Sequence, residues 1–231
     1  MSEFRDKFIG FVDILGFKDL VSKAERGEGR PLSELRLLLA NLASEDEMRH
    51  FKTHGPRICP GTTGLRRDLG FESTQVSDCV VASAKVSVAG AINLVHFCWG
   101  AAISLLGEGL MVRGYITRGL IYHSGNEFMG TGYQHAYESE ANVGIFKRQA
   151  DERGTPFVEV DPEVTRYILA HGDDCVRKIF DRYVKYDGDS AALFPFKRLV
   201  HSFVVAGFGR PPSIPTRSSP VTLLSGRHSK T

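Results

Sequence analysis

The sequence predicts an α+β fold with the order strand, helix, strand, strand, helix, strand. The first observation is the stretch 8–17, which carries apolar residues on both faces and breaks at Gly16 before a helix-prone segment. The second is a pair of strand-like runs, 71–75 and 79–84, around a tight turn. The third is the almost uncharged stretch 88–106, which is typical of a buried helix. This order is that of the ferredoxin-like βαββαβ plan, in which the first strand lies in the middle of the sheet beside the hairpin.

The other elements follow from local patterns. Ser33 can cap a helix, and Pro162 can begin another. We expect one domain over 1–209, which ends in an extension of strands and helices, and a disordered tail over 210–231, which is rich in Pro, Ser and Gly. The further elements expected are helices over 17–24 and 33–50, strands over 110–117 and 120–122, a helix over 133–153, a strand over 156–160, a helix over 163–170, and strands over 183–186 and 192–196.

Composition narrows the class of protein. A chain of 231 residues suits one large domain, and its formal net charge of +2 without a basic block argues against nucleic acid as a partner. The first residues show neither a signal-peptide pattern nor a lipidation motif. The four cysteines are Cys59, Cys79, Cys98 and Cys175. They are widely spaced and lack the spacing of a zinc site, so we expect reduced thiols and a cytoplasmic location.

The stretch 88–106 is about as long as a membrane span, which takes ~20 residues. Asn93, His96 and Ser104 interrupt it. We therefore expect a buried helix and no membrane span; a membrane span is the alternative. Because the helix is apolar nearly all round, we also expect part of it to pack on a second subunit of a homodimer.

Asp13 is the single carboxylate in the apolar first strand, and it needs water or a cation as a partner. In the βαββαβ plan it lies next to Asp78, at the tip of the hairpin. Two carboxylates this close repel each other, and two divalent cations that bridge to a triphosphate suit them better than a shared proton. The backbone N–H groups of Leu15, Gly16 and Phe17 then offer a place for phosphate oxygens. The alternative is two carboxylates of unrelated function.

Four segments in this order resemble the catalytic domain of class III nucleotidyl cyclases, and more particularly the Pycsar pyrimidine nucleotide cyclases of bacterial anti-phage defence. They cover about residues 5–142 and read VDILGF, VSDCVVAS, VRGYITRG and FMGTGYQHAYESE. The resemblance implies that Asp13 and Asp78 are catalytic and bind two Mn²⁺ or Mg²⁺ ions. It also implies that the main-chain carbonyl of Ile14 ligates a metal.

The activity that this resemblance implies is attack of the ribose 3′-oxygen on the α-phosphorus of a pyrimidine nucleoside triphosphate, which releases pyrophosphate. UTP is favoured, giving 3′,5′-cyclic UMP. The resemblance further implies a homodimer with sites at the interface and a second messenger that a separate effector protein senses. The alternatives are a cytidylate cyclase that gives cyclic CMP, and a catalytically silent module that binds a nucleotide or only dimerises.

The chain departs from the family at the helix that carries an Asn and a transition-state Arg. The closest alignment places Ala136 and Glu140 at those positions. A later register would use Asn142 with a basic residue a few positions on. The transition-state cation therefore stays open among Arg118, Lys147 and Arg148.

The purine-selecting Lys expected shortly before the second Asp is also missing, because 71–75 contains none. Its absence argues for a pyrimidine base. Thr74 or Gln75 could read the Watson–Crick edge of that base through hydrogen bonds. The alternative is that both are solvent-side strand residues.

Overall fold

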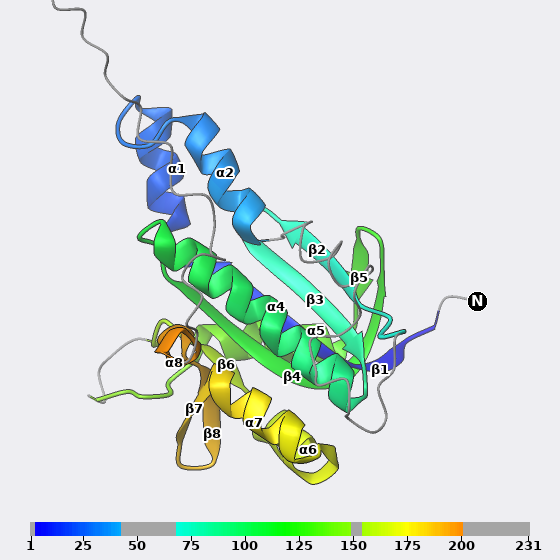
Figure 1. The fold of residues 1–231 in the computed structure, drawn as a ribbon. Helices are drawn as coiled ribbons and strands as arrows, with labels where there is room; N and C mark the ends of the chain where they lie inside the picture. Colours follow the sequence, from blue (N-terminus) through cyan, green and yellow to red (C-terminus); the bar gives the residue numbers. More distant parts are fainter. Residues whose placement is uncertain (1–2, 43–67, 149–153, 201–231) are drawn as a thin grey trace, which may run out of the picture.

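The computed structural model describes residues 3–42, 68–148 and 154–200 (Figure 1). The elements, in chain order, are β1 (Arg5–Ile14), α1 (Phe17–Glu25), α2 (Leu32–Leu42), β2 (Glu72–Val76), β3 (Cys79–Lys85), α4 (Val88–Gly107), β4 (Val112–Ser124), β5 (Glu127–Met129), α5 (Thr131–Ala141), β6 (Val158–Val160), α6 (Pro162–His171), α7 (Asp174–Tyr183), β7 (Val184–Asp187), β8 (Ser190–Leu193) and α8 (Pro195–Val200).

The strands form one sheet in the order β2-β3-β1-β4-β6-β8-β7, and β5 pairs with β4. The strand β1 lies between β3 and β4 and is antiparallel to both. The first four strands therefore have the ferredoxin-like arrangement, and β6, β7 and β8 extend the sheet beyond β4. The predicted α+β fold, with a βαββαβ core and C-terminal additions, is confirmed.

The two faces of the sheet differ in what covers them. On β1, Phe8 and Val12 belong to the large core cluster under α4, whereas Ile9 and Phe11 belong to a smaller cluster with Ala136 of α5. In Figure 1, α4 lies in front of the sheet and α5 behind it. Alternate residues of a strand point to opposite faces, so Asp13 shares the α5 face with Ile9 and Phe11.

The helix α4 is the core helix of this chain. Of the described residues, it is the one helix long and apolar enough to cross a membrane, but 78% of its apolar window is buried inside the fold. The C-terminal additions cover it: His96 Nδ1 lies 2.6 Å from the Tyr183 hydroxyl, and the indole N–H of Trp99 donates to the Pro195 carbonyl at 3.2 Å. Most of its apolar surface is thus buried within one subunit, and packing of α4 on a second subunit stays a prediction.

Several element boundaries differ from those predicted. The strands expected over 110–117 and 120–122 are one strand, β4. The helix expected over 133–153 ends at Ala141, because Val143 and Ile145 turn inward to pack against Ala192 of β8. The helix α7 was not predicted, and the strand over 192–196 divides into β8 and α8. The segments 43–50, 149–153 and 210–231 of the predicted elements lie outside the described residues.

The cysteines only partly follow the prediction. Cys79 and Cys98 are free. Cys175 is disulfide-bonded, so the expectation of a reduced thiol is wrong at this position. Chain spacing alone cannot reveal such a pairing, because the tertiary structure brings the partners together. Cys59 lies outside the described residues.

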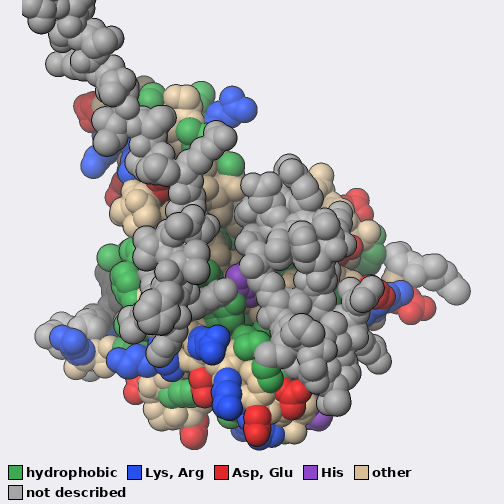
Figure 2. All heavy atoms as spheres, in the orientation of Figure 1, with side chains coloured by type: hydrophobic (Ala, Val, Ile, Leu, Met, Phe, Trp, Pro, Cys, Tyr) green, Lys and Arg blue, Asp and Glu red, His purple; other side chains and the backbone are tan. Residues whose placement is uncertain are grey.

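Charged side chains of both signs are interspersed over the lower part of the α4 face, as Figure 2 shows. Lys and Arg stand among Asp and Glu there. On the part of this face that the described residues form, the charges thus make a mixed surface.

Gly114 of β4 provides a test of how tightly the central strands pack. A Cβ there would collide with the backbone of Phe11 on β1, whereas a Cβ at Gly100 of α4 would meet no atom within 4 Å. We expect Gly114→Ala to lower the free energy of unfolding by about 3 kcal/mol. Gly100→Ala should raise it by roughly 0.5 to 1 kcal/mol, because Ala restricts the unfolded chain. Urea unfolding of both variants measures this, and a similar change in the two would contradict it.

Candidate functional site

The structure brings Asp13 and Asp78 together at one end of the sheet. Asp13 pairs with Cys79 of β3, and Asp78 directly precedes that residue. The N–H of Ile14 donates to the Asp78 carbonyl at 3.1 Å. Asp78 belongs to the loop between β2 and β3, in which Ser77 has a φ of 54°. A positive φ is uncommon for a residue with a side chain, and here it closes the tight turn that carries Asp78.

Negative charge accumulates around Asp13. Burial and the nearby carboxylates of Asp78 and Glu140 together raise its pKa to about 6, while the Arg113 guanidinium opposes this shift. Burial and the same neighbouring carboxylates raise the pKa of the Cys79 thiol to about 11. A site with several carboxylates and one cation attracts a positively charged ligand.

The donor set at this end of the sheet fits a hard divalent cation. Within the described ranges, no group of three or more His, Cys, Asp and Glu side chains is close enough to hold a metal ion. The two carboxylates and the predicted Ile14 carbonyl are oxygen donors, which Mg²⁺ and Mn²⁺ prefer. Such ions commonly take their other ligands from water and from substrate phosphates. The residues therefore fit metal ions that arrive with a nucleotide.

The start of α1 lies directly after Asp13 and Ile14. Gly16 precedes the helix in the left-handed conformation, with a φ of 76°, and no side chain caps the helix. The first N–H groups of the helix therefore have no intrahelical partner, and an anion can accept from them. The N–H of Leu15 already donates to the Met111 carbonyl at 3.0 Å. Of the three predicted phosphate contacts, Gly16 and Phe17 are thus better placed than Leu15.

The two residues predicted to read the base lie on opposite faces of β2. Thr74 pairs with Val81, which belongs to the cluster on the α5 face, whereas Gln75 pairs with Val80, which belongs to the cluster under α4. Gln75 donates from Nε2 to the Ser77 carbonyl at 3.1 Å. Only Thr74 shares the face of Asp13.

Thr74 is part of a buried chain of hydrogen bonds. Its hydroxyl donates to the Gly125 carbonyl at 2.6 Å and lies 2.9 Å from His123 Nε2. His123 Nδ1 lies 2.9 Å from the Ser83 hydroxyl, which accepts from the Lys7 ammonium at 3.3 Å. Because Lys7 can only donate and the Gly125 carbonyl can only accept, a neutral His123 protonated on Nε2 completes the chain.

This chain of hydrogen bonds predicts that the stability of the fold depends on pH. Burial, assisted by the charge of Lys7, lowers the pKa of His123 from 6.5 to about 4. A lowered folded-state pKa means that the unfolded chain binds the proton first, so stability is complete above pH 6.5 and is lost as the pH falls towards 4. We expect the free energy of unfolding to fall by about 2 kcal/mol more in the wild type than in His123→Asn between pH 7 and pH 5. Urea unfolding at both pH values tests this, and parallel losses would contradict it.

The candidates for a transition-state cation divide clearly. Arg118 pairs with Phe8, so it lies on the α4 face, where it binds Asp6 at 2.6 Å and Glu163 at 3.4 Å. Of the three candidates left open, Arg118 therefore lies on the face of the sheet opposite to Asp13. Lys147 and Arg148 are exposed beyond the end of α5.

The cation that the structure places beside Asp13 was not predicted from the sequence. Arg113 of β4 pairs directly with Asp13 of β1. Its Nε donates to Glu140 Oε1 of α5 at 2.6 Å. The register between β1 and β4 decides this placement, and no local pattern in the sequence reports that register.

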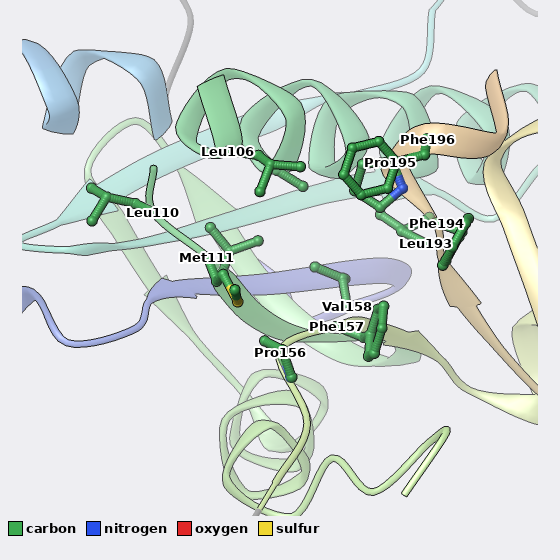
Figure 3. Close-up of a pocket in the computed structure, with 12 residues that line it drawn as sticks. Leu106, Leu110, Met111, Pro156, Phe157, Val158, Leu193, Phe194, Pro195 and Phe196 are labelled. Carbon is green, nitrogen blue, oxygen red and sulfur yellow. The ribbon is translucent and has the colours of Figure 1, made fainter. Parts of the chain in front are cut away.

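Two cavities lie near this end of the sheet. One, of about 210 Å³, lies among α4, β4, β6 and α8, and its labelled side chains are all apolar, including Leu106, Met111 and Phe157 (Figure 3). Such a lining offers a triphosphate no partners. The other, of about 370 Å³, lies between β4 and α5 on the face of Asp13. Its lining is polar: Tyr115, His135, Glu138, Ser139, Asn142 and Glu159.

No protein-family model matches the chain, and no curated protein sequence matches it. Solved structures with a similar fold include a bacterial light-regulated adenylyl cyclase, with 16% identity and a TM-score of 0.45 over 72% of this chain and 46% of that one. The chain thus spans just under half the length of that protein.

Two other solved structures with a similar fold are the catalytic core of a rhodopsin-guanylyl cyclase with converted specificity in complex with ATPalphaS, and an adenylate/guanylate cyclase/hydrolase from Silicibacter pomeroyi. The former has 13% identity and a TM-score of 0.46 over 72% of this chain and 82% of that one. The latter has 14% identity and a TM-score of 0.45 over 73% and 82%. Such low similarity concerns the fold and says nothing of the substrate.

Proposed function

We propose that this chain is a nucleotide cyclase that converts a pyrimidine nucleoside triphosphate, UTP in preference to CTP, into a 3′,5′-cyclic nucleotide and pyrophosphate. The observation that carries the proposal is the pair Asp13 and Asp78, which lie next to each other at one end of the sheet, beside the uncapped start of α1. Carboxylates that can hold divalent cations then lie beside N–H groups that can hold phosphate.

The chain's share of the reaction is binding and orientation. Asp13 and Asp78, with the Ile14 carbonyl, would hold two Mn²⁺ or Mg²⁺ ions. When bound, such ions lower the pKa of a coordinated hydroxyl and neutralise phosphate charge. The N–H groups of Gly16 and Phe17 bind phosphate oxygens, which aligns the α-phosphorus with the ribose 3′-oxygen. The 3′-oxygen bonds to that phosphorus, and the bond to the β-phosphate breaks with its electron pair on pyrophosphate.

The experiment that tests this proposal is incubation of the purified protein with each of the four ribonucleoside triphosphates and Mn²⁺. Products are identified by mass spectrometry. A cyclic pyrimidine nucleotide with release of pyrophosphate is the expected result. If none of the four triphosphates gives a cyclic product, the alternative remains, a catalytically silent module that binds a nucleotide. Glu140 favours this alternative, because it stands where the resemblance places the transition-state Arg.

The cellular role that we propose follows the resemblance of the four motifs: a cytoplasmic second-messenger synthase in anti-phage defence, whose product a separate effector protein senses. We also propose a homodimer with sites at its interface. The α5 face supports it, because Val76 and Tyr137 expose 49% and 55% of their surface there, and Tyr137 packs edge-on against Phe11. Exposed apolar side chains beside an open site are typical of a surface that a partner covers.

A charge placed on this face should separate the subunits. Tyr137→Glu is expected to turn the dimer into a monomer and to abolish cyclic nucleotide formation, because burying a lone carboxylate in an interface is costly. Leu37→Glu is the matched control, since Leu37 is 67% exposed on α2 and away from the α5 face. Sedimentation velocity at micromolar concentration measures both variants. A wild-type monomer that stays monomeric with nucleotide would contradict the dimer.

A further inference from the structure

A largely buried ion pair adjoins the two carboxylates of the proposed site. Arg113 Nε donates to Glu140 Oε1 at 2.6 Å, and the two side chains are 21% and 8% exposed. Arg113 pairs with Asp13 across β1 and β4, so the guanidinium belongs to the same face. Asp13 and Arg113 stand opposite each other in the β1–β4 ladder, and Glu140 is bonded to that same guanidinium. The pair is therefore within electrostatic reach of the site.

Stability alone does not explain this pair. Removing two charges from water costs free energy that their attraction seldom fully returns, and apolar residues of similar volume are often as stable. An ion pair beside a cluster of carboxylates is thus better explained by what its cation can bind. Among the described residues, Arg113 is the cation that pairs with Asp13 across the two strands and binds Glu140.

The guanidinium is held in one orientation with donors to spare. The bond to Glu140 uses Nε, which leaves the two terminal amino groups for another acceptor. On one side the guanidinium lies against Gly154, where a Cβ would come within 2.9 Å of Nη1. Glu140 is fixed in turn near the end of α5, where its carbonyl accepts from the Val143 N–H at 3.2 Å. A planar fork held in this way suits the oxygens of a phosphate.

We propose that Arg113 is a catalytic residue that binds the phosphate chain of the nucleotide, and that Glu140 is its positioning residue. This role rests on the proposed cyclase function. As the bond from the 3′-oxygen to the α-phosphorus forms and the bond to the β-phosphate breaks, negative charge grows on the departing pyrophosphate oxygens. Arg113 donates hydrogen bonds to those oxygens, while the 3′-hydroxyl proton leaves to water. A fixed cation that meets growing negative charge lowers the barrier.

The kinetic test removes the pair without leaving a lone buried charge. In Arg113→Met/Glu140→Met we expect kcat to fall about 100-fold or more, with an unfolding midpoint close to that of the wild type. The matched control is Asp6→Asn/Arg118→Met, an ion pair between the same two strands on the opposite face, which should keep kcat within about twofold. Wild-type kcat in the Met/Met variant would overturn the proposal.

If that variant fails to fold, Arg113→Lys provides the test, because Lys keeps the positive charge but lacks the planar guanidinium. We expect a fall in kcat of at least about tenfold, and an unchanged kcat would overturn the proposal.

A binding measurement separates this inference from the proposed function. Isothermal titration with inorganic triphosphate and Mg²⁺ needs no turnover. We expect the wild type and the Asp6/Arg118 control to bind, and Arg113→Met/Glu140→Met to bind at least about tenfold more weakly, which is the effect of one charged hydrogen bond. Equal binding by the Met/Met variant, or no binding by the wild type, overturns the role of Arg113. If triphosphate binds as expected but no cyclic nucleotide forms, the cyclase proposal fails and phosphate binding by Arg113 stands.

Discussion

Replacing Asp13 or Asp78 with Asn is expected to lower cyclic nucleotide formation by about 1000-fold, the equivalent of roughly 4 kcal/mol in transition-state stabilisation. Each change removes a carboxylate that the proposed metal ions need, while the backbone of β1 and of the hairpin is unaffected. The activity of each variant is measured with saturating Mn²⁺ and the preferred triphosphate. A loss of this size in both would show that the reaction needs each carboxylate.

The fold should survive the Asp13 substitution. The pKa of Asp13 is raised from 3.8 to about 6, so the folded state disfavours the ionised form. This cost develops as the pH rises from 3.8 to about 6 and is fully present at neutral pH. Asp13→Asn removes it, and the free energy of unfolding at pH 7.5 should therefore not decrease. An essential residue whose removal does not destabilise the protein serves chemistry.

Asp189 provides the matched control for Asp78. It is an exposed residue of the short turn between β7 and β8, as Asp78 is a residue of the turn between β2 and β3. Asp189→Asn should retain activity. Near-normal activity in Asp13→Asn or Asp78→Asn would remove this site from consideration.

Pyrimidine triphosphates are expected to be cyclised at least about tenfold faster than purine triphosphates, with UTP ahead of CTP. The missing Lys before Asp78 removes a donor to a purine ring. Thr74 is the predicted base contact that shares the face of Asp13, and its hydroxyl proton is already donated to Gly125. It can therefore only accept, and both uracil N3–H and the cytosine amino group can donate to it. Mismatched polar groups that stay buried cost roughly 1 to 3 kcal/mol each.

A competition assay with the four triphosphates at equal concentration measures this preference. Thr74→Val should weaken it, whereas Thr74→Ser, which keeps the hydroxyl, should preserve it. Dominant cyclic AMP or cyclic GMP would refute the pyrimidine assignment. Dominant cyclic CMP would overturn only the choice of uracil.

Local sequence patterns were sufficient to predict the central strand, the turn that carries Asp78 and the buried helix. The run around Asp13 is apolar on both faces, which is enough to predict a central strand, since such a strand is stable only when covered on both sides. The turn at Ser77 and Asp78 is likewise visible locally. Given the βαββαβ plan, these two observations predicted the neighbouring carboxylates. The apolar stretch 88–106 predicted a buried helix for the same reason, but not the elements that cover it.

Only the tertiary structure decided which cations and polar groups face the site. A shift of one residue in the pairing of β1 with β4 would exchange Arg113 for a neighbour on the other face, and side-chain periodicity within one strand carries no information about such a shift. The same alternation separates Thr74 from Gln75 and removes Arg118 from the site. Glu140 meets Arg113 because α5 packs behind the sheet, across 27 residues of chain. The sequence by itself determined the carboxylates and their strand, whereas strand register and helix packing, which are long-range properties, decided their partners.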